Sequence, residues 1–537
     1  MTSEVNGFIR ASGEAIVNGE GRELLLRGVG LGSWLLPEGY MWRFPEQGDR
    51  PRRMERMVSD LLGEEKAELF WETYYHNYIT EKDIEAIAAE GFNSIRLPIN
   101  ARFLLGEDEP LRLIPGRIEV IDSVIAWCRK HSLYVILDLH GAPGGQTGTN
   151  IDDSEHNKPE LFIMESCQRL TVELWRVIAE RYKEEWIVAG YDLLNEPLPN
   201  WFSEYNHLVM PLYRQIIQAI REVDERHMII LEGVHWATDW SIFDEKPDDN
   251  LMLQFHKYWS NPDMESIQAY LDMRKAWNAP IFMGEGGENN CDWYAGVFRL
   301  YEDHRISWNF WTWKKMDCTN SPCSVTRPSG WQLLVDYLEG GEKPDAAVAE
   351  RILFEYAGNL LFERCSYHGR VVNALFRRPS VRIPAVFYGY EGIGKSFGIQ
   401  RPAEQRINFR VNDGTDLRFV SGQGEKPNYQ HYGGEEWTQE EWLYVHLAAE
   451  DWLAYEFTGP SGDSVTARLE LIVRVSGQGA VALFLDDEYL GIVEPEGDTW
   501  QNVVLQDPFE VKAGTHRLEL RAKGQPVSLQ WITLNKL

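Results

Sequence analysis

Short apolar runs alternate with longer amphipathic stretches from residue 1 to about residue 375, and this alternation constrains the fold more than any other feature. Such a pattern is typical of βα units, in which helices connect parallel strands. Eight equivalent units in succession favour a closed (β/α)8, or TIM, barrel over an open, doubly wound sheet. The candidate strands are Leu24–Val29, Ser94–Ile99, Tyr134–His140, Tyr191–Glu196, Met228–Glu232, Leu251–His256, Pro280–Glu285 and Ile306–Trp313.

The pattern changes beyond residue 375. A chain of 537 residues is too long for one barrel, which takes about 250 residues, and Pro and Gly residues gather between 376 and 402, as they do at domain boundaries. Farther on, apolar residues alternate strictly with polar ones, which indicates an antiparallel β-sandwich. We therefore predict an α/β chain with a (β/α)8 barrel at residues 1–378, a linker at 379–396 and a C-terminal antiparallel β-sandwich domain at 397–537. The alternating residues are Val465, Ala467, Leu469, Leu471, Val473, Val475, Val527, Leu529 and Trp531.

The net charge of the chain excludes some classes of binding partner. There are 83 acidic and 53 basic residues, so the formal net charge is −30. A field of this sign repels phosphate backbones and anionic lipid, so we expect neither a nucleic-acid nor a membrane partner. No run reaches the roughly 20 apolar residues that cross a bilayer. The first residues lack the layout of a signal peptide, so we expect a cytoplasmic protein or a secreted one whose signal has been removed; the oligomeric state is left open.

The cysteines and histidines do not indicate a metal. Six cysteines in so long a chain do not make a disulfide framework, and we expect Cys318 and Cys323 to be free thiols. His140 and His256 lack a third ligand at suitable spacing, and the His-Glu-x-x-His motif does not occur. We therefore expect no metal and no cofactor.

Polar or aromatic side chains stand at or near the ends of most candidate strands. In a barrel of this type the side chains that carry chemistry lie at the carboxyl ends of the strands. A lone glutamate there is more often part of a structural ion pair, but a whole set at successive ends is hard to explain as scaffold. The set comprises Arg96, His140, Asn195, Glu196, His256, Tyr258, Glu285 and Trp313.

Glu196 and Glu285 are the candidate catalytic pair. They come from the fourth and seventh candidate strands, which face each other across the mouth of a barrel. Two carboxylates that converge on a cleft suit acid–base cleavage of an acetal, because their repulsion raises the pKa of one and leaves the other ionised. If they stand about 5–5.5 Å apart, the ionised group can attack the sugar directly with retention of configuration.

This set of residues, together with the segment Leu26–Trp34 that opens the barrel, resembles glycoside hydrolase family five over about residues 8–375. The family comprises cellulase-like, retaining (β/α)8 glycosidases. The resemblance implies that Glu196 is the acid/base and Glu285 the nucleophile. It further implies that Asn195 binds the sugar 2-hydroxyl, that Arg96 and Tyr258 hold Glu285 ionised, that His140 and His256 line the cleavage subsite, and that Trp313 is its stacking floor.

The glycine-rich segment after His140, up to Ser154, is similar to the exo-acting β-1,3-glucanase branch of that family, with a flexible surface loop as the alternative. We expect a retaining glycosidase for β-linked glycosides of the β-glucan or β-mannan type, with exo action left open. The alternatives in the same family are β-mannosides, glycolipids, and furanosides such as arabinofuranosides or galactofuranosides. A non-catalytic sugar-binding protein is the alternative of another class.

The C-terminal part resembles a family-six-like carbohydrate-binding module. Trp500 matches a tryptophan that stacks on sugar in such modules, whereas His446 stands at the position of a tyrosine and Ser528 near that of an asparagine. Sugar binding and a purely structural role therefore both stay open. The matching stretches are Asn412–Asp416, Asp451–Tyr455, Thr499–Gln501 and Ala513–Leu518.

Residues 389–396 fit the phosphate-loop pattern GxxxxGK[ST] and give a further alternative, a nucleotide-binding module. A phosphate loop needs a helix directly after it, so that backbone N–H groups point at the phosphate. The sequence after Ser396 is strand-like and contains Pro402. We therefore interpret the match as a coincidence within a linker.

Overall fold

A computed structural model describes residues 4–107, 110–404, 406–460 and 466–537, so Val465 of the alternating set lies outside the described residues. The chain divides into two compact units. We call the first the barrel unit (Met1–Lys257, Tyr270–Gly286 and Ser307–Tyr367) and the second the sandwich unit (Tyr258–Ala269, Gly287–Ile306 and His368–Leu537).

The barrel unit contains a closed barrel of eight strands, which confirms the predicted (β/α)8 class. Strands β5 to β11 are buried at every position, as expected of apolar strands that are covered on both faces. Gly28 and Gly30 of β4 give room to Asn309 and Trp311, which a Cβ atom would approach to within 3 Å. The strands are β4 (Arg27–Gly30), β5 (Ser94–Asn100), β6 (Tyr134–Gly141), β7 (Val188–Asp192), β8 (Met228–Glu232), β9 (Leu251–His256), β10 (Ile281–Gly287) and β11 (Ser307–Trp311).

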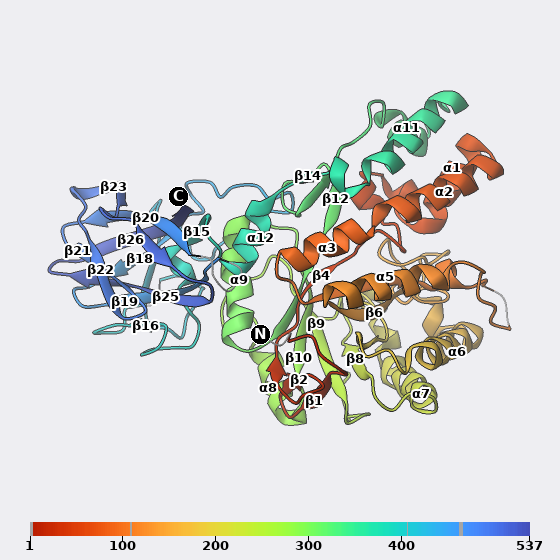
Figure 1. Ribbon diagram of the computed structural model, residues 1–537, viewed down its shortest axis with the longest axis horizontal. Helices are drawn as coiled ribbons and strands as arrows, with labels where there is room; N and C mark the ends of the chain where they lie inside the picture. The colour runs from red at the N-terminus through yellow and green to blue at the C-terminus, as the bar shows by residue number, and fades with distance from the viewer. Residues whose placement is uncertain (1–3, 108–109, 405, 461–465) are drawn as a thin grey trace. The chain divides into compact units, whose positions relative to one another are not determined.

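Helices lie outside the strands of this barrel (Figure 1). They are amphipathic; in α6, for example, Leu170, Leu174 and Ile178 lie on one buried stripe. Helix α11 contacts α1 and α2 beside the barrel. The helices are α1 (Pro51–Leu62), α2 (Glu64–Tyr78), α3 (Glu81–Ala89), α4 (Ala101–Leu104), α5 (Ile118–His131), α6 (Glu165–Tyr182), α7 (Val209–Arg221), α8 (Gln268–Trp277), α10 (Gln332–Leu338) and α11 (Ala346–Asn359).

Two small sheets complete the barrel unit. One consists of β1 (Arg10–Ser12), β2 (Ala15–Val17) and β3 (Glu23–Leu24). The other consists of β12 (Lys314–Met316), β13 (Cys323–Val325) and β14 (Ser366–Tyr367). Strand β12 begins three residues after β11 ends, so the chain leaves the barrel at this point.

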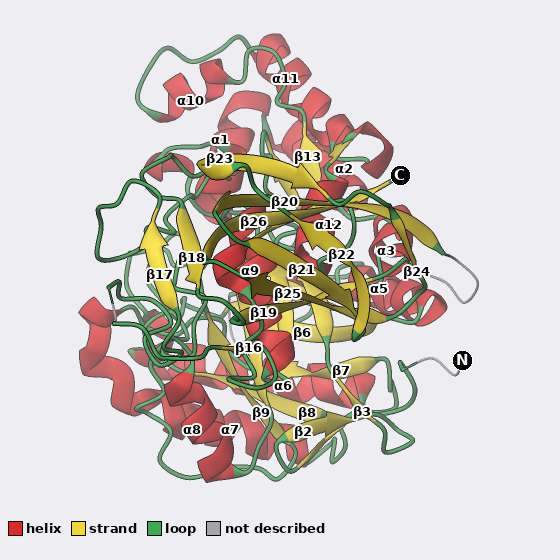
Figure 2. Ribbon diagram, turned by 90° about the vertical axis from the view of Figure 1, so that its left-hand side faces the viewer, coloured by secondary structure: helices red, strands yellow, loops and turns green. Residues whose placement is uncertain are grey.

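The sandwich unit contains two antiparallel sheets, which confirms the C-terminal β-sandwich (Figure 2). In β20, Ala467, Leu469, Leu471 and Val473 are buried while their neighbours are partly or fully exposed. The first sheet comprises β15 (Val381–Pro384), β17 (Asp416–Phe419), β18 (Leu443–Leu447), β20 (Ala467–Gly477), β23 (Gly497–Val504), β24 (Phe509–Val511) and β26 (Val527–Lys536). The second comprises β16 (Phe397–Gly398), β19 (Trp452–Thr458), β21 (Ala480–Leu485), β22 (Glu488–Val493) and β25 (Thr515–Lys523).

The segment predicted as a linker takes part in this fold. Strand β15 lies within residues 379–396 and pairs with β26, so its backbone hydrogen bonds are made inside a sheet. Helices α9 (Cys291–Asp303) and α12 (Gly369–Phe376) also belong to the sandwich unit. The predicted boundaries at residues 378 and 397 stay a prediction.

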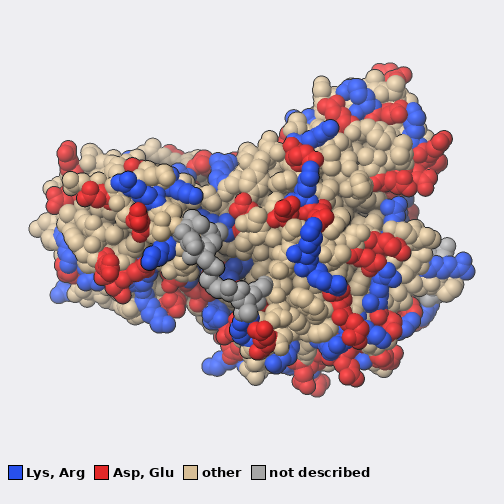
Figure 3. Space-filling model, in the orientation of Figure 1, with Lys and Arg blue, Asp and Glu red and all other residues tan. Residues whose placement is uncertain are grey.

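The structure also bears on the surface charge, the cysteines and the hydrophobic length of the helices. Acidic and basic side chains are interspersed on the face shown in Figure 3. All six cysteines are free, as expected for Cys318 and Cys323. Within the described parts of the chain, no helix is both long enough and apolar enough to span a bilayer.

Candidate active site

Glu196 and Glu285 lie close together at the carboxyl end of the barrel. Glu285 lies in β10, and Glu196 follows β7; their side chains are almost fully buried. One oxygen of each carboxylate and a ring nitrogen of His256 all lie within 4.8 Å of one another. The backbone of Glu196 has φ of 45°, a left-handed conformation that bulky residues rarely adopt and that is often found at functional sites.

Arg96 lies at the centre of a buried network of charges. Its guanidinium is fully buried in β5, and all three nitrogens have partners. Burial by itself lowers the pKa of Arg96, but the surrounding carboxylates raise it well above the ordinary value. The partners are Glu285 Oε1 at 2.5 Å, Asp192 Oδ2 at 2.8 Å, Asn195 Oδ1 at 2.9 Å, Glu232 Oε1 at 3.0 Å and Asp138 Oδ2 at 3.2 Å.

His256 contacts both candidate catalytic carboxylates. Its Nδ1 lies 2.6 Å from Glu196 Oε1 and 3.6 Å from Glu285 Oε2, and its Nε2 lies 3.4 Å from Glu232 Oε1. Burial by itself lowers the pKa of His256, but the carboxylates of Glu232 and Glu285 raise it well above the ordinary value. His256 is therefore a second cation near neutral pH, and its Nδ1–H donates to Glu196.

His140 is neutral, unlike His256. Burial lowers the pKa of His140 to about 4, so its ring is neutral near pH 7. Its Nδ1 lies 2.7 Å from Asp138 Oδ2, and its Nε2 lies 3.3 Å from Asn195 Nδ2. The tautomer that satisfies both contacts carries its hydrogen on Nδ1, donates to Asp138 and accepts from Asn195. Trp311 stacks on this ring, with the two planes within 3° of parallel and the centroids 5.5 Å apart.

The pKa of Glu285 lies above its ordinary value, whereas the resemblance implies that Arg96 and Tyr258 hold this carboxylate ionised. Burial raises the pKa of Glu285 above its ordinary value, and His256 and Arg96 oppose this effect without cancelling it. Burial also raises the pKa of Asp138 to about 8 and that of Asp192 well above its ordinary value. The network therefore holds more acidic groups than cations, and protons stay on some of them near neutral pH.

Trp313, one of the predicted site residues, is placed apart from this cluster. Trp313 is fully buried, donates from its indole N–H to Asp83 at 3.0 Å and stacks on Phe362. The structure thus brings Trp311, rather than Trp313, to His140. Tyr258 belongs to the sandwich unit, where its ring contacts Trp259. The predicted contact of Tyr258 with Glu285 stays a prediction.

Sequence reasoning did not single out Glu232, although it ends the fifth candidate strand. Its Oε2 accepts the backbone N–H of Glu196 at 2.7 Å, and its Oε1 faces Arg96 and His256. Burial by itself raises the pKa of Glu232, but His256 and Arg96 lower it below its ordinary value. The strand-end rule that identified Glu196 would also have identified Glu232.

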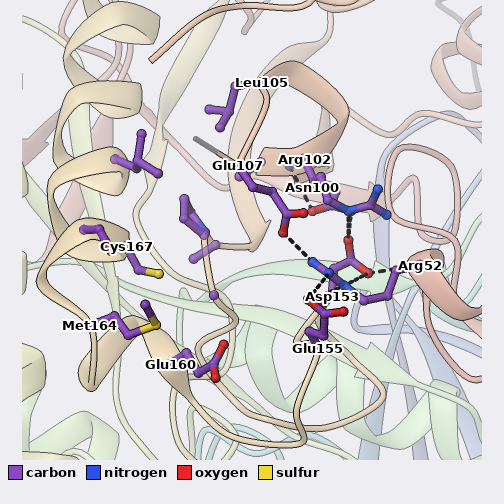
Figure 4. Close-up of a pocket in the computed structure, with 16 residues that line it drawn as sticks. Arg52, Asn100, Arg102, Leu105, Glu107, Asp153, Glu155, Glu160, Met164 and Cys167 are labelled. Carbon is purple, nitrogen blue, oxygen red and sulfur yellow. Dashed lines mark hydrogen bonds and ion pairs between the residues drawn. The ribbon is translucent and has the colours of Figure 1, made fainter. Parts of the chain in front are cut away.

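Hydrogen bonds from buried side chains hold the connection between β6 and α6 in place. Gln146 is fully buried and donates from Nε2 to the backbone carbonyls of His140 and Asn195, which ties this connection to the residue before Glu196. Farther along, Asp153 accepts hydrogen bonds from Arg52, Asn100 and Arg102 (Figure 4). A cavity of about 170 Å³ lies beside this anchor, with Met164 and Cys167 on its other side.

The phosphate-loop match does not have the geometry of a phosphate loop. Strand β16, and not a helix, follows Ser396. The backbone N–H of Tyr390 donates to Asp303, and that of Glu391 donates to the Ser396 hydroxyl. These donors are not directed at a ligand, so the structure does not support a nucleotide-binding module at residues 389–396.

A metal is also a possible occupant of a carboxylate–histidine cluster. Glu196, His256 and Glu285 could each offer one ligand atom. Arg96, however, already binds Glu285, and His256 is held protonated by the carboxylates around it. A metal at this cluster would have to displace the proton of His256 and compete with Arg96 for Glu285, so the charges present favour acid–base chemistry there.

Residues 60–317 match the sequence profile of the family described as Cellulase (glycosyl hydrolase family 5). A β-xylosidase from Phanerodontia chrysosporium is 32% identical over 253 residues, which are 47% of this chain and 52% of that protein. A probable glucan 1,3-beta-glucosidase A from Aspergillus fumigatus is 31% identical over 240 residues, which are 44% of this chain and 56% of that protein. The chain thus spans little more than half the length of these relatives.

Among solved structures, an endogalactoceramidase covers 98% of this chain and 99% of its own, with 16% identity and a TM-score of 0.47. The matched segment 60–317 includes Arg96, Glu196, Glu232 and Glu285. That segment, just under half of the chain, is thus similar to glycosyl hydrolase family 5, a family of glycosidases, and the similarity supports a glycosidase.

Proposed function

We propose that the chain is a retaining β-glycoside hydrolase in which Glu285 is the nucleophile and Glu196 the acid/base. The observation that supports this most is the approach of the two carboxylates, whose oxygens lie within 4.8 Å of each other and of His256. Retaining enzymes need carboxyl groups about 5–5.5 Å apart, whereas inverting enzymes leave room for a water between them.

In the first step, a Glu285 oxygen forms a bond to the anomeric carbon while Glu196 gives its proton to the departing glycosidic oxygen. Arg96 holds Oε1 of Glu285, so Oε2 is the oxygen that attacks. In the second step, Glu196 takes a proton from water, the water oxygen bonds to the anomeric carbon and the bond to Glu285 breaks. His256 Nδ1 lies 2.6 Å from Glu196 Oε1 and orients this carboxyl group in both steps.

We further propose that Asn195, His140 and Trp311 hold the sugar at the cleavage subsite. Asn195 is fixed at both ends of its amide, by Arg96 on Oδ1 and His140 on Nδ2, which leaves one N–H to donate to the 2-hydroxyl. Trp311 lies on His140 and takes the role of aromatic floor that the sequence assigned to Trp313.

The sugar is a β-linked glycoside in this proposal, which is supported by the names of the two curated relatives, a β-xylosidase and a glucan 1,3-beta-glucosidase. A panel of substrates identifies the sugar. It comprises aryl β-xylosides, β-glucosides, β-mannosides and furanosides, together with β-1,3-glucan, xylan and glycolipid, and the rate of hydrolysis of each is compared. Proton NMR of the first-formed product tests the mechanism, since a β-anomer formed from a β-glycoside means retention.

Replacement of the nucleophile gives a second test of the mechanism. Glu285→Ala should lower kcat by about 10⁴-fold or more, and azide should restore turnover by forming a glycosyl azide. An inverted first product, or wild-type rates in Glu285→Ala, would contradict the proposal.

The surroundings of Trp500 in the sandwich unit differ from those of a family-six-like sugar-binding site. Trp500 is half-buried and packs edge-on against Tyr444. His446 and Ser528, which replace the tyrosine and asparagine expected of a family-six-like module, face each other at 3.0 Å. A role of Trp500 in sugar binding stays a proposal and is tested below.

A further inference from the structure

We infer that the sandwich unit binds a neutral carbohydrate in a cavity formed by the segment after β9 and two segments before β18. The cavity measures about 580 Å³, and every residue that lines it belongs to the sandwich unit. This site is distinct from Trp500 and adds a binding function to the proposed hydrolysis. It does not depend on which residues perform the chemistry in the barrel unit.

The lining has the chemistry that hydroxyl groups require. Amides and hydroxyls that both donate and accept hydrogen bonds predominate, and sugar hydroxyls do the same. Trp259 adds an aromatic ring for the apolar C–H face of a sugar, with Tyr432 against it at a centroid distance of 4.3 Å. The hydroxyl- and amide-bearing residues of the lining are Ser260, Asn261, Ser266, Asn408, Asn428, Tyr429 and Gln430.

The same lining disfavours other classes of ligand. Its charged side chains are Asp263, Glu265 and Lys426, so carboxylates outnumber cations and a phosphate or other anion would be repelled. Val411 and Pro427 are its aliphatic side chains, which is too little apolar surface for a lipid chain. A neutral, polyhydroxylated ligand fits both restrictions.

Among the residues that the structure describes, two buried hydroxyls in the lining have no hydrogen-bond partner. Ser260 Oγ and Tyr429 Oη are buried, and neither makes a hydrogen bond within the described residues. Tyr429 is 4% exposed. A buried hydroxyl without a partner is unfavourable and is rare in folded proteins, so such an atom beside a cavity marks a place where a ligand or water completes the bond.

The walls of the cavity are held in place by hydrogen bonds. Asn261 donates to the backbone carbonyl of Asn408 at 3.1 Å, and the backbone N–H of Asn408 donates to Glu425. Asn289 donates to the carbonyl of Tyr429 at 2.6 Å. Segments distant in sequence are thus fixed before a ligand arrives, which reduces the entropy lost on binding.

Affinity electrophoresis tests the inference. The full chain is run in native gels that contain soluble β-1,3-glucan, xylan or β-1,4-glucan, and its retardation in each gel is measured. Glu285→Gln serves as the background, because it prevents hydrolysis during the run. On this background we combine Tyr429→Phe, Asn408→Ala and Gln430→Ala. Asn408 and Gln430 suit this test because their side chains are exposed and have no hydrogen bond within the described part of the chain, so their removal should leave the fold intact. The apparent Kd for at least one glycan should rise about tenfold.

Tyr489→Ala on the same background is the matched control, because Tyr489 is an exposed aromatic residue of the sandwich unit outside the cavity lining, and it should leave the retardation unchanged. Trp500→Ala is measured beside it. Equal retardation with and without the three cavity substitutions overturns the inference, as does the absence of retardation on all three glycans. Loss of retardation in Trp500→Ala alone would place sugar binding at that surface instead. Hydrolysis of aryl glycosides with Glu285 intact is measured separately, so failure of the proposed hydrolysis and failure of this inference are distinguishable.

Discussion

Each unit contains a buried arginine, but the groups that contact the two guanidinium groups differ. Arg96 of the barrel unit faces the carboxylates of Asp138, Asp192, Glu232 and Glu285. Arg410 of the sandwich unit faces one carboxylate, Asp413, and donates its other hydrogen bonds to backbone carbonyls.

The difference indicates a structural role for Arg410 and supports the proposed functional role of Arg96. The carbonyls around Arg410 are neutral dipoles that satisfy its donors, and the rings of Tyr388 and Tyr390 cover it. The carboxylates around Arg96 outnumber the cations and shift one another's pKa values. Buried groups held in such an unbalanced state are typical of sites that move protons.

The largest effect in the barrel unit, after loss of Glu285 as the proposed nucleophile, is expected from Glu196→Ala. Removal of a general acid lowers the rate by about 10²–10⁴-fold. The loss should be greatest for substrates whose leaving group needs protonation, and small for activated aryl glycosides such as dinitrophenyl glycosides. Steady-state rates on a series of leaving groups measure this; a uniform loss across the series would argue against the acid role.

Exchange of the two buried arginines for lysine compares the units directly. Arg96→Lys should lower kcat by about 100-fold or more, because an ammonium cannot bind Glu285, Asp192 and Asn195 together. Arg410→Lys should lower Tm by several degrees, as expected for a loss of about 1–3 kcal/mol, and leave kcat within about twofold of the wild-type value. Steady-state kinetics and thermal melting of both variants test this difference between the two arginines. A similar loss of kcat in both variants would contradict it.

Glu232→Gln is expected to have a moderate effect through positioning. Glutamine still accepts the backbone N–H of Glu196, but the charge that raises the pKa of His256 is gone. We expect kcat to fall about tenfold and the alkaline limb of the pH–rate profile to move to lower pH, as His256 loses its proton earlier.

Glu519→Gln is the matched control for Glu232→Gln, since Glu519 is a buried carboxylate of the sandwich unit paired with Arg517 and Arg521. Its pH–rate profile should equal that of the wild-type protein. An unchanged profile in Glu232→Gln would show that Glu232 has only a structural role.

The smallest expected effect is on the pH dependence of stability. Burial raises the pKa of Asp138 to about 8, so the folded chain holds a proton that the unfolded chain releases above about pH 4. The stability linked to this group is present below pH 4 and is lost as the pH rises through 8. Asp138→Asn should therefore make the free energy of unfolding fall less steeply between pH 5 and 8, as measured by urea denaturation.

Glu441 of the sandwich unit provides the control. Burial by itself raises the pKa of Glu441, but hydrogen bonds from Thr438 and Asn428 lower it below the ordinary value, so it is ionised in both states over this range. Glu441→Gln should leave the slope unchanged. If the slope of Asp138→Asn also equals that of the wild-type protein, Asp138 is not the group that holds the proton.

Much of the barrel site could be predicted from sequence because the side chains that carry chemistry in such a barrel lie at the carboxyl ends of the strands. That rule singled out Arg96, His140, Asn195, Glu196, His256 and Glu285, which the structure brings into one buried cluster. It did not place Trp313 correctly, because β11 already ends at Trp311 and the chain leaves the barrel there.

The sequence by itself determined the two fold classes, since the spacing of apolar residues reports whether a segment is covered on one face or on both. It also determined which charged groups stand at the strand ends. Only the tertiary structure decided that Trp311 lies on His140, that Glu232 holds the backbone of Glu196, and that burial outweighs Arg96 in setting the pKa of Glu285. These outcomes depend on distances and on the exclusion of water, and both arise only when strands far apart in the chain are brought together.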